Sequence, residues 1–166
     1  MDIDYYVDEY GDYLFQMAYV YTKDIQLAEE VVQDVFIKFY NSNQFEGRSS
    51  VKTYLTRMTI NCCYDHLRKW KRRKAQFFEY FSKSERHGEQ FTIEQQERDD
   101  ILNAILKLPL KYREVLLLYY YDDLTVIEVA SLLHIPESTV TTRLQRARVK
   151  LKELLPTTDW EVLRNA

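Results

Sequence analysis

The chain of 166 residues contains few of the residues that interrupt secondary structure, with only three glycines and three prolines. Glycine and proline mark turns, so their scarcity favours long helices over a protein of short strands and tight turns. Hydrophobic residues make up 46% and charged residues 30% of the chain. This composition excludes collagen-like, linker-like and largely disordered chains. The length allows one ordinary domain or two small ones.

Long hydrophobic runs and a secretory signal are also missing. No apolar run approaches the roughly 18 residues that a membrane-spanning helix needs. The chain starts with the acidic segment Met1-Asp2-Ile3-Asp4, where a signal peptide would be basic and then apolar. We therefore expect a cytoplasmic protein with no segment inserted in a membrane.

Residue patterns for catalysis or metal binding are equally scarce. The two cysteines, Cys62 and Cys63, are adjacent and lack the spacing of a metal or redox motif, so we expect two reduced thiols on a helix. The three histidines are scattered, and neither a catalytic triad nor a glycine-rich phosphate loop is visible. The sequence thus predicts no enzyme, no metal and no cofactor.

Charge is distributed unevenly along the chain, although its net value is only −3. Residues 1–48 carry a net charge of −7, and residues 49–75 carry +7. An acidic stretch over 76–100, at −4, precedes a second basic segment over 137–155, at +3. Two basic segments predict phosphate binding at two separate places.

Hydrophobic spacing predicts an all-α fold of two small helical domains. Residues 1–75 indicate three or four helices, including one capped by Asp24 and a long helix that starts near Ser50 or Thr53. Residues 76–98 have no sustained apolar stripe and predict a flexible linker. Residues 99–166 form a second helical unit, in which one helix is expected from Leu110 to Tyr121.

A helix-turn-helix is predicted near the C-terminus. Thr125 and Glu128 fit a capping box, a short helix follows, and Pro136 opens a longer helix. Opposite the apolar stripe of that longer helix lie small polar and guanidinium groups, which hydrogen-bond base edges in the major groove. Flanking Arg143 and Arg148 suit phosphates. The candidate DNA contacts are Ser138, Thr139, Thr141, Thr142, Arg143, Gln145 and Arg146.

The basic segment 49–75 places a second set of polar side chains on one helix face, namely Asn61, Asp65, Arg68, Lys69 and Arg72. The sequence leaves open whether Asp65 orients a neighbouring arginine, accepts a hydrogen bond from a base amine or forms an ion pair with Lys69. Upstream, Phe45, Arg48 and Ser49 suit unstacked single-stranded bases. A lone phenylalanine tucked into the core is the competing interpretation of Phe45.

The acidic helix over 24–40 is expected to turn Ala28, Val31, Val35 and Phe39 inward. Its opposite face then carries Glu30, Gln33, Asp34 and Ile37. An exposed isoleucine surrounded by charged groups is typical of a surface that binds a protein partner.

Together these segments resemble bacterial sigma factors of the sigma-70 family. Residues 28–36 resemble region two. Residues 45–73 resemble the segment that reads and melts the minus-ten element, and Asn61, Asp65 and Arg68 match its Asn-x3-Asp-x2-Arg pattern. Leu108-Pro109, residues 113–116 and Thr125 to Leu155 resemble region four. The match covers nearly the whole chain in the right order, and the short length resembles the extracytoplasmic-function (ECF) group.

The resemblance implies partners for each surface. Glu30, Gln33 and Asp34, with Ile37 beside them, match positions that bind the β′ clamp helices of core RNA polymerase. Residues 45–50 match a loop that captures a flipped base, and the recognition helix matches minus-thirty-five contacts. The β subunit and an anti-sigma factor are further implied partners, and a stress or envelope response is the implied setting.

Some residues depart from the family pattern, and other functions stay open. Tyr54 replaces a usual Trp, and Thr141 stands where a basic residue is common, which puts the promoter sequence in doubt.

A stand-alone helix-turn-helix regulator that binds an operator as a dimer is one alternative. An interaction module that binds polymerase or an anti-sigma factor without reading DNA is another.

Overall fold

A computed structural model describes residues 2–42, 45, 47–78 and 96–155 of the chain. Every regular element in these ranges is a helix, so the predicted all-α fold is confirmed. The chain divides into two compact units, Met1–Glu89 and Gln90–Ala166. Most of the predicted linker, residues 76–98, lies outside the described residues, as does the segment 156–166.

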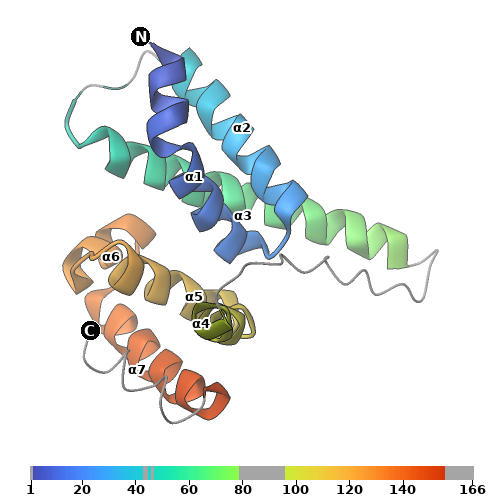
Figure 1. Ribbon diagram of the computed structural model, residues 1–166, viewed down its shortest axis with the longest axis vertical. Coiled ribbons are helices and arrows are strands. Elements are labelled where there is room, and N and C mark those ends of the chain that lie inside the picture. Colours follow the sequence, from blue (N-terminus) through green and yellow to red (C-terminus); the bar gives the residue numbers. More distant parts are fainter. Residues whose placement is uncertain (1, 43–44, 46, 79–95, 156–166) are drawn as a thin grey trace. The chain divides into compact units, whose positions relative to one another are not determined.

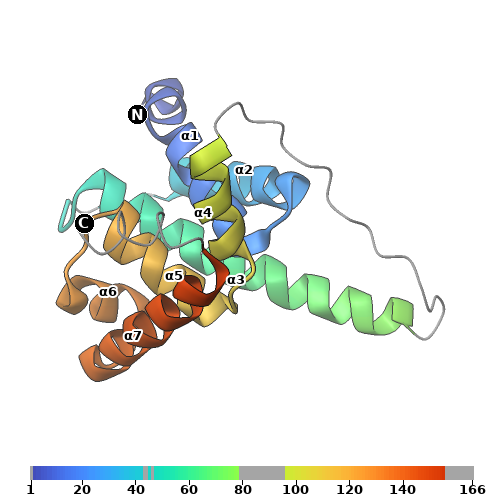
Figure 2. The same cartoon turned by 60° about the horizontal axis from the view of Figure 1, so that its bottom comes forward.

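The N-terminal unit consists of three helices, α1 (Ile3–Thr22), α2 (Ile25–Asn41) and α3 (Val51–Phe78). Helices α1 and α2 lie side by side, and α3 crosses both of them (Figures 1 and 2). The second half of α3 extends past α1 and α2 in both views. The basic residues Arg68, Lys69, Lys71, Arg72 and Arg73 of this half are exposed.

Side-chain caps fix where these helices begin. The Asp24 carboxylate accepts a hydrogen bond from the Leu27 N–H at 2.8 Å, which confirms the predicted cap of α2. The Ser50 hydroxyl accepts from the Thr53 N–H at 3.1 Å, so α3 begins at Val51. Lys23, with φ of 57°, ends α1 in the left-handed region, and its N–H donates to the Tyr19 carbonyl.

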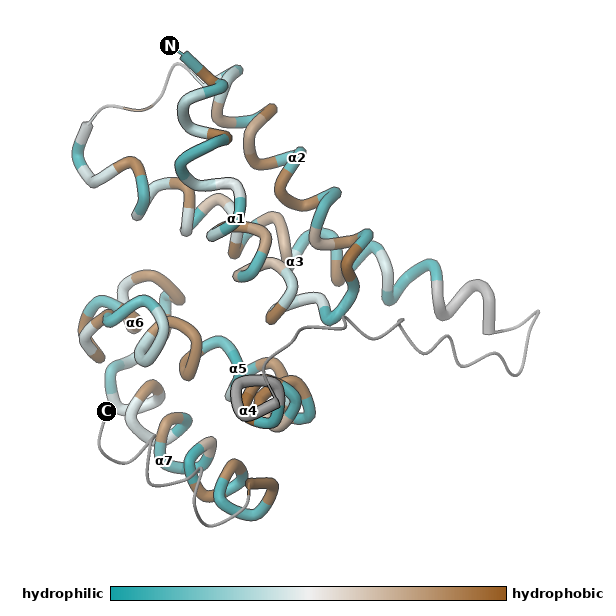
Figure 3. The backbone as a smooth tube through the Cα atoms, in the orientation of Figure 1, coloured by the Kyte–Doolittle hydropathy of each residue, from teal (hydrophilic) through white to brown (hydrophobic). Residues whose placement is uncertain are grey.

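The core of this unit is formed by the facing sides of the three helices. All four predicted inward residues of α2 are buried: Ala28, Val31, Val35 and Phe39. They meet Leu14, Met17 and Tyr21 of α1 and Leu55 of α3, all of them buried. Hydrophobic and hydrophilic stretches alternate along α2 (Figure 3), as expected for a helix with one buried face.

The C-terminal unit contains α4 (Gln96–Leu106), α5 (Leu110–Leu116), the π-helical turn η1 (Leu117–Tyr121), α6 (Val126–Leu133) and α7 (Glu137–Leu154). The helix predicted from Leu110 to Tyr121 is therefore present, and its last five residues form a π turn in place of an α-helical one. The Asp122 N–H donates to the Leu117 carbonyl, five residues back, at 3.1 Å. A π turn adds one residue to the turn, which an apolar run does not encode.

Helices α6 and α7 form the predicted helix-turn-helix. The Thr125 hydroxyl accepts from the Glu128 N–H at 3.3 Å, and the Glu128 carboxylate accepts from the Thr125 N–H at 2.7 Å, so the capping box is confirmed. His134, with φ of 55°, ends α6 in the left-handed region. The Ile135 N–H then donates to the Ala130 carbonyl at 3.1 Å, which closes the turn.

Candidate nucleic-acid and partner interfaces

The apolar stripe of α7 determines which of its side chains face outward. Val140, Leu144, Ala147 and Leu151 are buried, and α7 packs on α5 and α6. Leu155 completes the stripe, because Leu154 is 44% exposed. The opposite face is exposed as predicted and carries Ser138, Thr141, Thr142, Gln145 and Arg146, while Thr139 and Arg143 are half-buried. All seven candidate contacts of this helix therefore come from its first ten residues.

Two hydroxyls on this face donate hydrogen bonds back into the helix. The Thr141 hydroxyl donates to the Glu137 carbonyl at 3.1 Å, and the Thr142 hydroxyl donates to the Ser138 carbonyl at 2.9 Å. Their oxygen lone pairs and methyl groups are left for a partner. A base amine and a thymine methyl are the groups that such side chains contact in the major groove.

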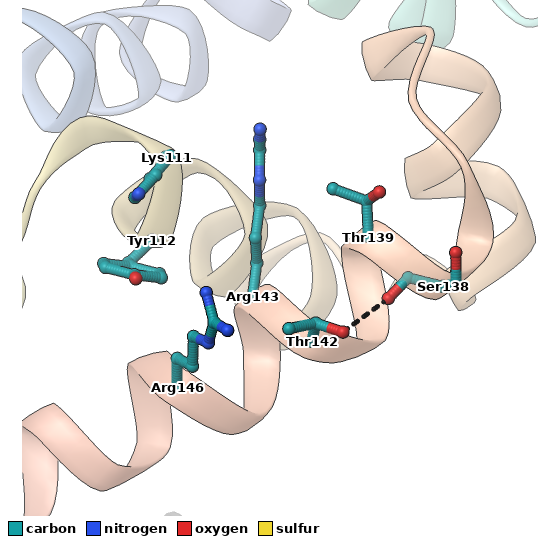
Figure 4. A pocket seen from close by; sticks show the side chains of 7 residues that line it. All are labelled: Lys111, Tyr112, Ser138, Thr139, Thr142, Arg143 and Arg146. Atoms are coloured by element: carbon teal, nitrogen blue, oxygen red, sulfur yellow. Dashed lines mark hydrogen bonds between the residues drawn. The ribbon is translucent and has the colours of Figure 1, made fainter.

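An open pocket of about 260 Å³ lies between the starts of α5 and α7 (Figure 4). Lys111 and Tyr112 come from α5, and Arg146 points toward Tyr112 from α7. The other lining residues belong to the predicted set: Ser138, Thr139, Thr142 and Arg143. The cations Lys111 and Arg146 beside one pocket suit a phosphate, and Lys111 is a lining residue that the sequence analysis missed.

The two flanking arginines of α7 have partners within the unit. Arg143 Nη1 donates to Glu114 Oε1 at 3.3 Å, and Glu114 is only 3% exposed. Arg148 Nε donates to the Tyr120 hydroxyl at 2.6 Å, and its guanidinium lies 5.6 Å from the centroid of that ring. Arg148, expected to contact phosphates, thus binds its own fold. The partner lies 28 residues away, beyond any local pattern.

The predicted minus-ten face lies on the exposed side of α3. Asn61, Arg68, Lys69 and Arg72 are exposed, and Asp65 is half-buried. Arg68 Nη2 donates to Asp65 Oδ1, so the carboxylate pairs with the arginine three residues on rather than with Lys69. This contact places the planar donor group of Arg68 beside Asp65. A base contact by Asp65 stays a prediction.

The loop before α3 contributes an aromatic side chain beside the core. The Phe45 ring lies 6.4 Å from that of Phe39 and 5.6 Å from that of Tyr54, both at steep angles. Such edge-to-face packing stabilises the ring in place, which supports the interpretation of Phe45 as a packed residue. Phe45 is half-buried, whereas Arg48 and Ser49, which follow it in the sequence, are exposed.

The predicted partner face of α2 has three exposed members, Glu30, Gln33 and Ile37, and the isoleucine is 59% exposed. Asp34 is half-buried because it contacts α3. Asp34 Oδ2 lies 2.7 Å from Nε2 of His66, and Glu30 Oε2 lies 4.0 Å from Nδ1 of the same ring. His66 is therefore a second residue that the sequence analysis missed, since its partner Asp34 is 32 positions away.

Both cysteines are free and buried on α3. Burial raises the pKa of the Cys63 thiol far above its usual range. Burial also raises the pKa of the Cys62 thiol, although the Lys38 ammonium group, with Nζ at 3.2 Å from the sulfur, opposes that rise. High pKa values keep the thiols protonated and slow their oxidation.

The residues that the structure describes hold no cluster of three metal-ligating side chains. Within the same ranges, no helix has the length and apolar character needed to span a bilayer. The exposed helix faces in these ranges are two basic faces, on α3 and α7, and one acidic face with an apolar centre, on α2.

Comparison with known proteins gives matches to both units. The family described as sigma-70 region 2 matches residues 6–73, and sigma-70 region 4 matches residues 98–151. Among solved structures, a complex titled as the sigma factor RpoE with the anti-sigma factor NepR from Bartonella quintana is similar in fold. Its TM-score is 0.72 at 24% identity, with 92% of this chain and 96% of that chain covered.

Curated relatives match over nearly their full length. The ECF RNA polymerase sigma factor SigW of Bacillus subtilis is 32% identical, with 90% of this chain and 86% of SigW covered. SigM of the same species is 30% identical, with 93% and 95% covered. Two family regions in order, together with relatives of this identity and coverage, show that the chain belongs to the ECF group of sigma-70 family sigma factors, which are not enzymes and direct RNA polymerase to promoters.

Proposed function

We propose that three separate surfaces divide the work of this sigma factor. The exposed face of α2, with Glu30, Gln33, Asp34 and Ile37, binds the β′ clamp helices of core RNA polymerase. The exposed face of α3 and the loop before it bind and open the minus-ten element, and α7 binds the minus-thirty-five element. Residues 1–75 thus act as region two, 76–98 as the connecting segment and 99–166 as region four, which also contacts the β subunit.

The observation that carries this proposal is the outward set of α7. Burial of the apolar stripe leaves small hydroxyl, amide and guanidinium groups exposed on the first turns, and the cationic pocket lies beside them. The exposed polar face of α3 supplies a second nucleic-acid surface on the other unit. When one unit binds its DNA element, the other unit is held near the second element, so two modest affinities give tight overall binding.

The setting of this activity is also part of the proposal. Similar proteins of known structure were solved as complexes, with the anti-sigma factor NepR in one case and with the cytosolic domain of CnrY in another. We propose that an anti-sigma factor holds this chain in the cytoplasm until a stress or envelope signal releases it.

Transcription by a defined mixture tests the proposal. Purified chain is combined with core polymerase and genomic DNA fragments, and the 5′ ends of the transcripts are sequenced. The expected result is a set of discrete new starts that share two spaced upstream motifs. No new starts with the native core enzyme would contradict the proposal and favour a regulator that binds an operator. A regulator of that kind would instead dimerise and shift duplex DNA alone.

Variants assign the surfaces in the same reaction. Q33A is expected to weaken binding to core polymerase, whereas R146A is expected to leave polymerase binding unchanged and to abolish dependence on the minus-thirty-five motif. An interaction module that does not read DNA would tolerate R146A and R68A. Lys107→Ala serves as a control, because this exposed cation lies between α4 and α5, outside both basic segments and outside the α2 face.

A further inference from the structure

His66 lies at the contact between α2 and α3, where the proposed polymerase-binding face meets the proposed minus-ten helix. Its Nε2 is 2.7 Å from Asp34 Oδ2, and its Nδ1 is 4.0 Å from Glu30 Oε2. The His66 side chain is only 15% exposed, whereas those of Asp34 and Glu30 are 45% and 55% exposed. One largely buried ring therefore faces two of the four residues proposed to bind polymerase.

The direction of the hydrogen bond follows from its chemistry. A carboxylate only accepts, so His66 donates the proton on Nε2 to Asp34. The bond occupies one oxygen of Asp34, and a carboxylate accepts several hydrogen bonds. Asp34 therefore keeps capacity for a cationic or N–H group of a partner while its position on the surface is fixed.

Fixing the position of Asp34 lowers the entropic cost of binding. A free acidic side chain loses rotamer entropy when a partner immobilises it. A histidine that holds the Asp34 carboxylate in place before binding removes part of that loss.

The same residue joins the two functional faces of the N-terminal unit. His66 directly follows Asp65, which pairs with Arg68 on the proposed minus-ten face. The neighbouring contact between Lys38 and Cys62, at 3.2 Å, lies one helical turn away on both helices. The contact between α2 and α3 thus includes two polar pairs, Asp34 with His66 and Lys38 with Cys62, beside the apolar core.

We infer that His66 is a positioning residue for polymerase binding, acting through Asp34. The inference rests on the proposed function of the α2 face. Its partner class is a protein surface that presents basic or N–H groups to two carboxylates, one helical turn apart.

A double-mutant cycle on the full chain tests this role. The dissociation constant for core polymerase is measured for the wild type, H66A, D34A and the double variant. We expect H66A to raise the constant by about tenfold, as for a hydrogen bond to a charged group. In the double variant the loss should be no larger than that of D34A alone, because the two residues act as one unit.

Rescue by a conservative variant separates positioning from general stability. H66Q keeps a side-chain donor, so it should recover most of the affinity that H66A loses. Circular dichroism monitors folding of each variant, and the cycle of H66L with D34A takes the place of the first cycle if H66A does not fold, because leucine keeps side-chain bulk and removes the donor. Wild-type affinity in H66A, or additive losses in the double variant, would overturn the inference.

Two further variants keep this outcome distinct from failure of the proposed function. Gln33 and Ile37 are exposed on the same face of α2. If Q33A and I37A bind polymerase as tightly as the wild type, the proposed polymerase face itself is wrong. If they weaken binding and H66A does not, only the role of His66 is refuted.

Discussion

At the residue scale, the start of α6 depends on two side chains that satisfy each other's backbone groups. Thr125 accepts from the Glu128 N–H, and Glu128 accepts both from the Thr125 N–H and from its hydroxyl at 2.9 Å. These bonds occupy donors that the first turn of a helix otherwise leaves unpaired. Because α6 packs on α7, the capping box stabilises the proposed DNA-binding helix indirectly.

We predict that T125A lowers the free energy of unfolding of the C-terminal unit by about 1 kcal/mol, the usual cost of losing an N-terminal cap. Hydrogen exchange of the α6 and α7 amides reports this change for the C-terminal unit alone. T125S retains the hydroxyl and is the matched control. Equal protection of T125A and T125S would show that the cap contributes little.

The capping box also gives stability a pH dependence. Hydrogen bonds from Thr125 lower the pKa of the Glu128 carboxyl below its ordinary value of 4.5. A lowered pKa in the folded state means that the charged carboxylate stabilises the fold above pH 4.5, and that this contribution is lost as the pH falls through the folded value. The difference in amide protection between wild type and E128Q should therefore shrink below about pH 4.5. A constant difference down to pH 3 would contradict this expectation.

At the element scale, α7 separates support from recognition on its two sides. Leu144 is 2% exposed within the apolar stripe, whereas Arg146, two residues later, is exposed on the opposite face. Residues two apart on a helix point in different directions, so substitutions at these positions test the two roles independently.

We predict that L144A affects stability, whereas R146A affects DNA binding. L144A removes a buried side chain and should destabilise the C-terminal unit by about 2–5 kcal/mol. R146A should change stability by no more than about 0.5 kcal/mol and should weaken binding to minus-thirty-five DNA in the polymerase complex. Denaturation and footprinting measure the two effects. A large loss of stability in R146A would mean that this guanidinium packs rather than reads DNA.

At the scale of the whole molecule, net charge and charge distribution act in opposite directions. The net charge of −3 opposes binding of the free chain to DNA, whereas the basic segments 49–75 and 137–155 attract phosphates locally. Binding to polymerase through the acidic face of α2 would shield part of the negative charge and place both basic helices on one promoter.

We therefore predict that the isolated chain binds duplex promoter DNA weakly, and that the complex with core polymerase binds it tightly. Fluorescence anisotropy with a labelled promoter duplex measures both affinities over a range of salt concentrations. Phosphate contacts make binding weaker at higher salt, so both forms should respond to salt. Tight, sequence-specific duplex binding by the isolated chain would support the alternative of a stand-alone regulator.

Local patterns determined much of this protein. The scarcity of glycine and proline, the spacing of Val31, Val35 and Phe39, and the capping signal at Thr125 predicted helices that the structure contains, because each depends on residues within one or two turns. The exposed faces of α2, α3 and α7 followed from the same periodicity. The sigma-70 family was also readable from the order of these segments along the chain.

Only the tertiary structure decided which side chains bind their own fold. Asp34 meets His66, Arg143 meets Glu114, and Arg148 meets Tyr120 over separations of 28 to 32 residues. The π turn at Leu117–Tyr121 likewise depends on hydrogen bonds that an apolar run does not encode. Periodicity says which face of a helix is polar, but the partner of a polar group depends on how helices pack, and that is fixed only when the chain folds.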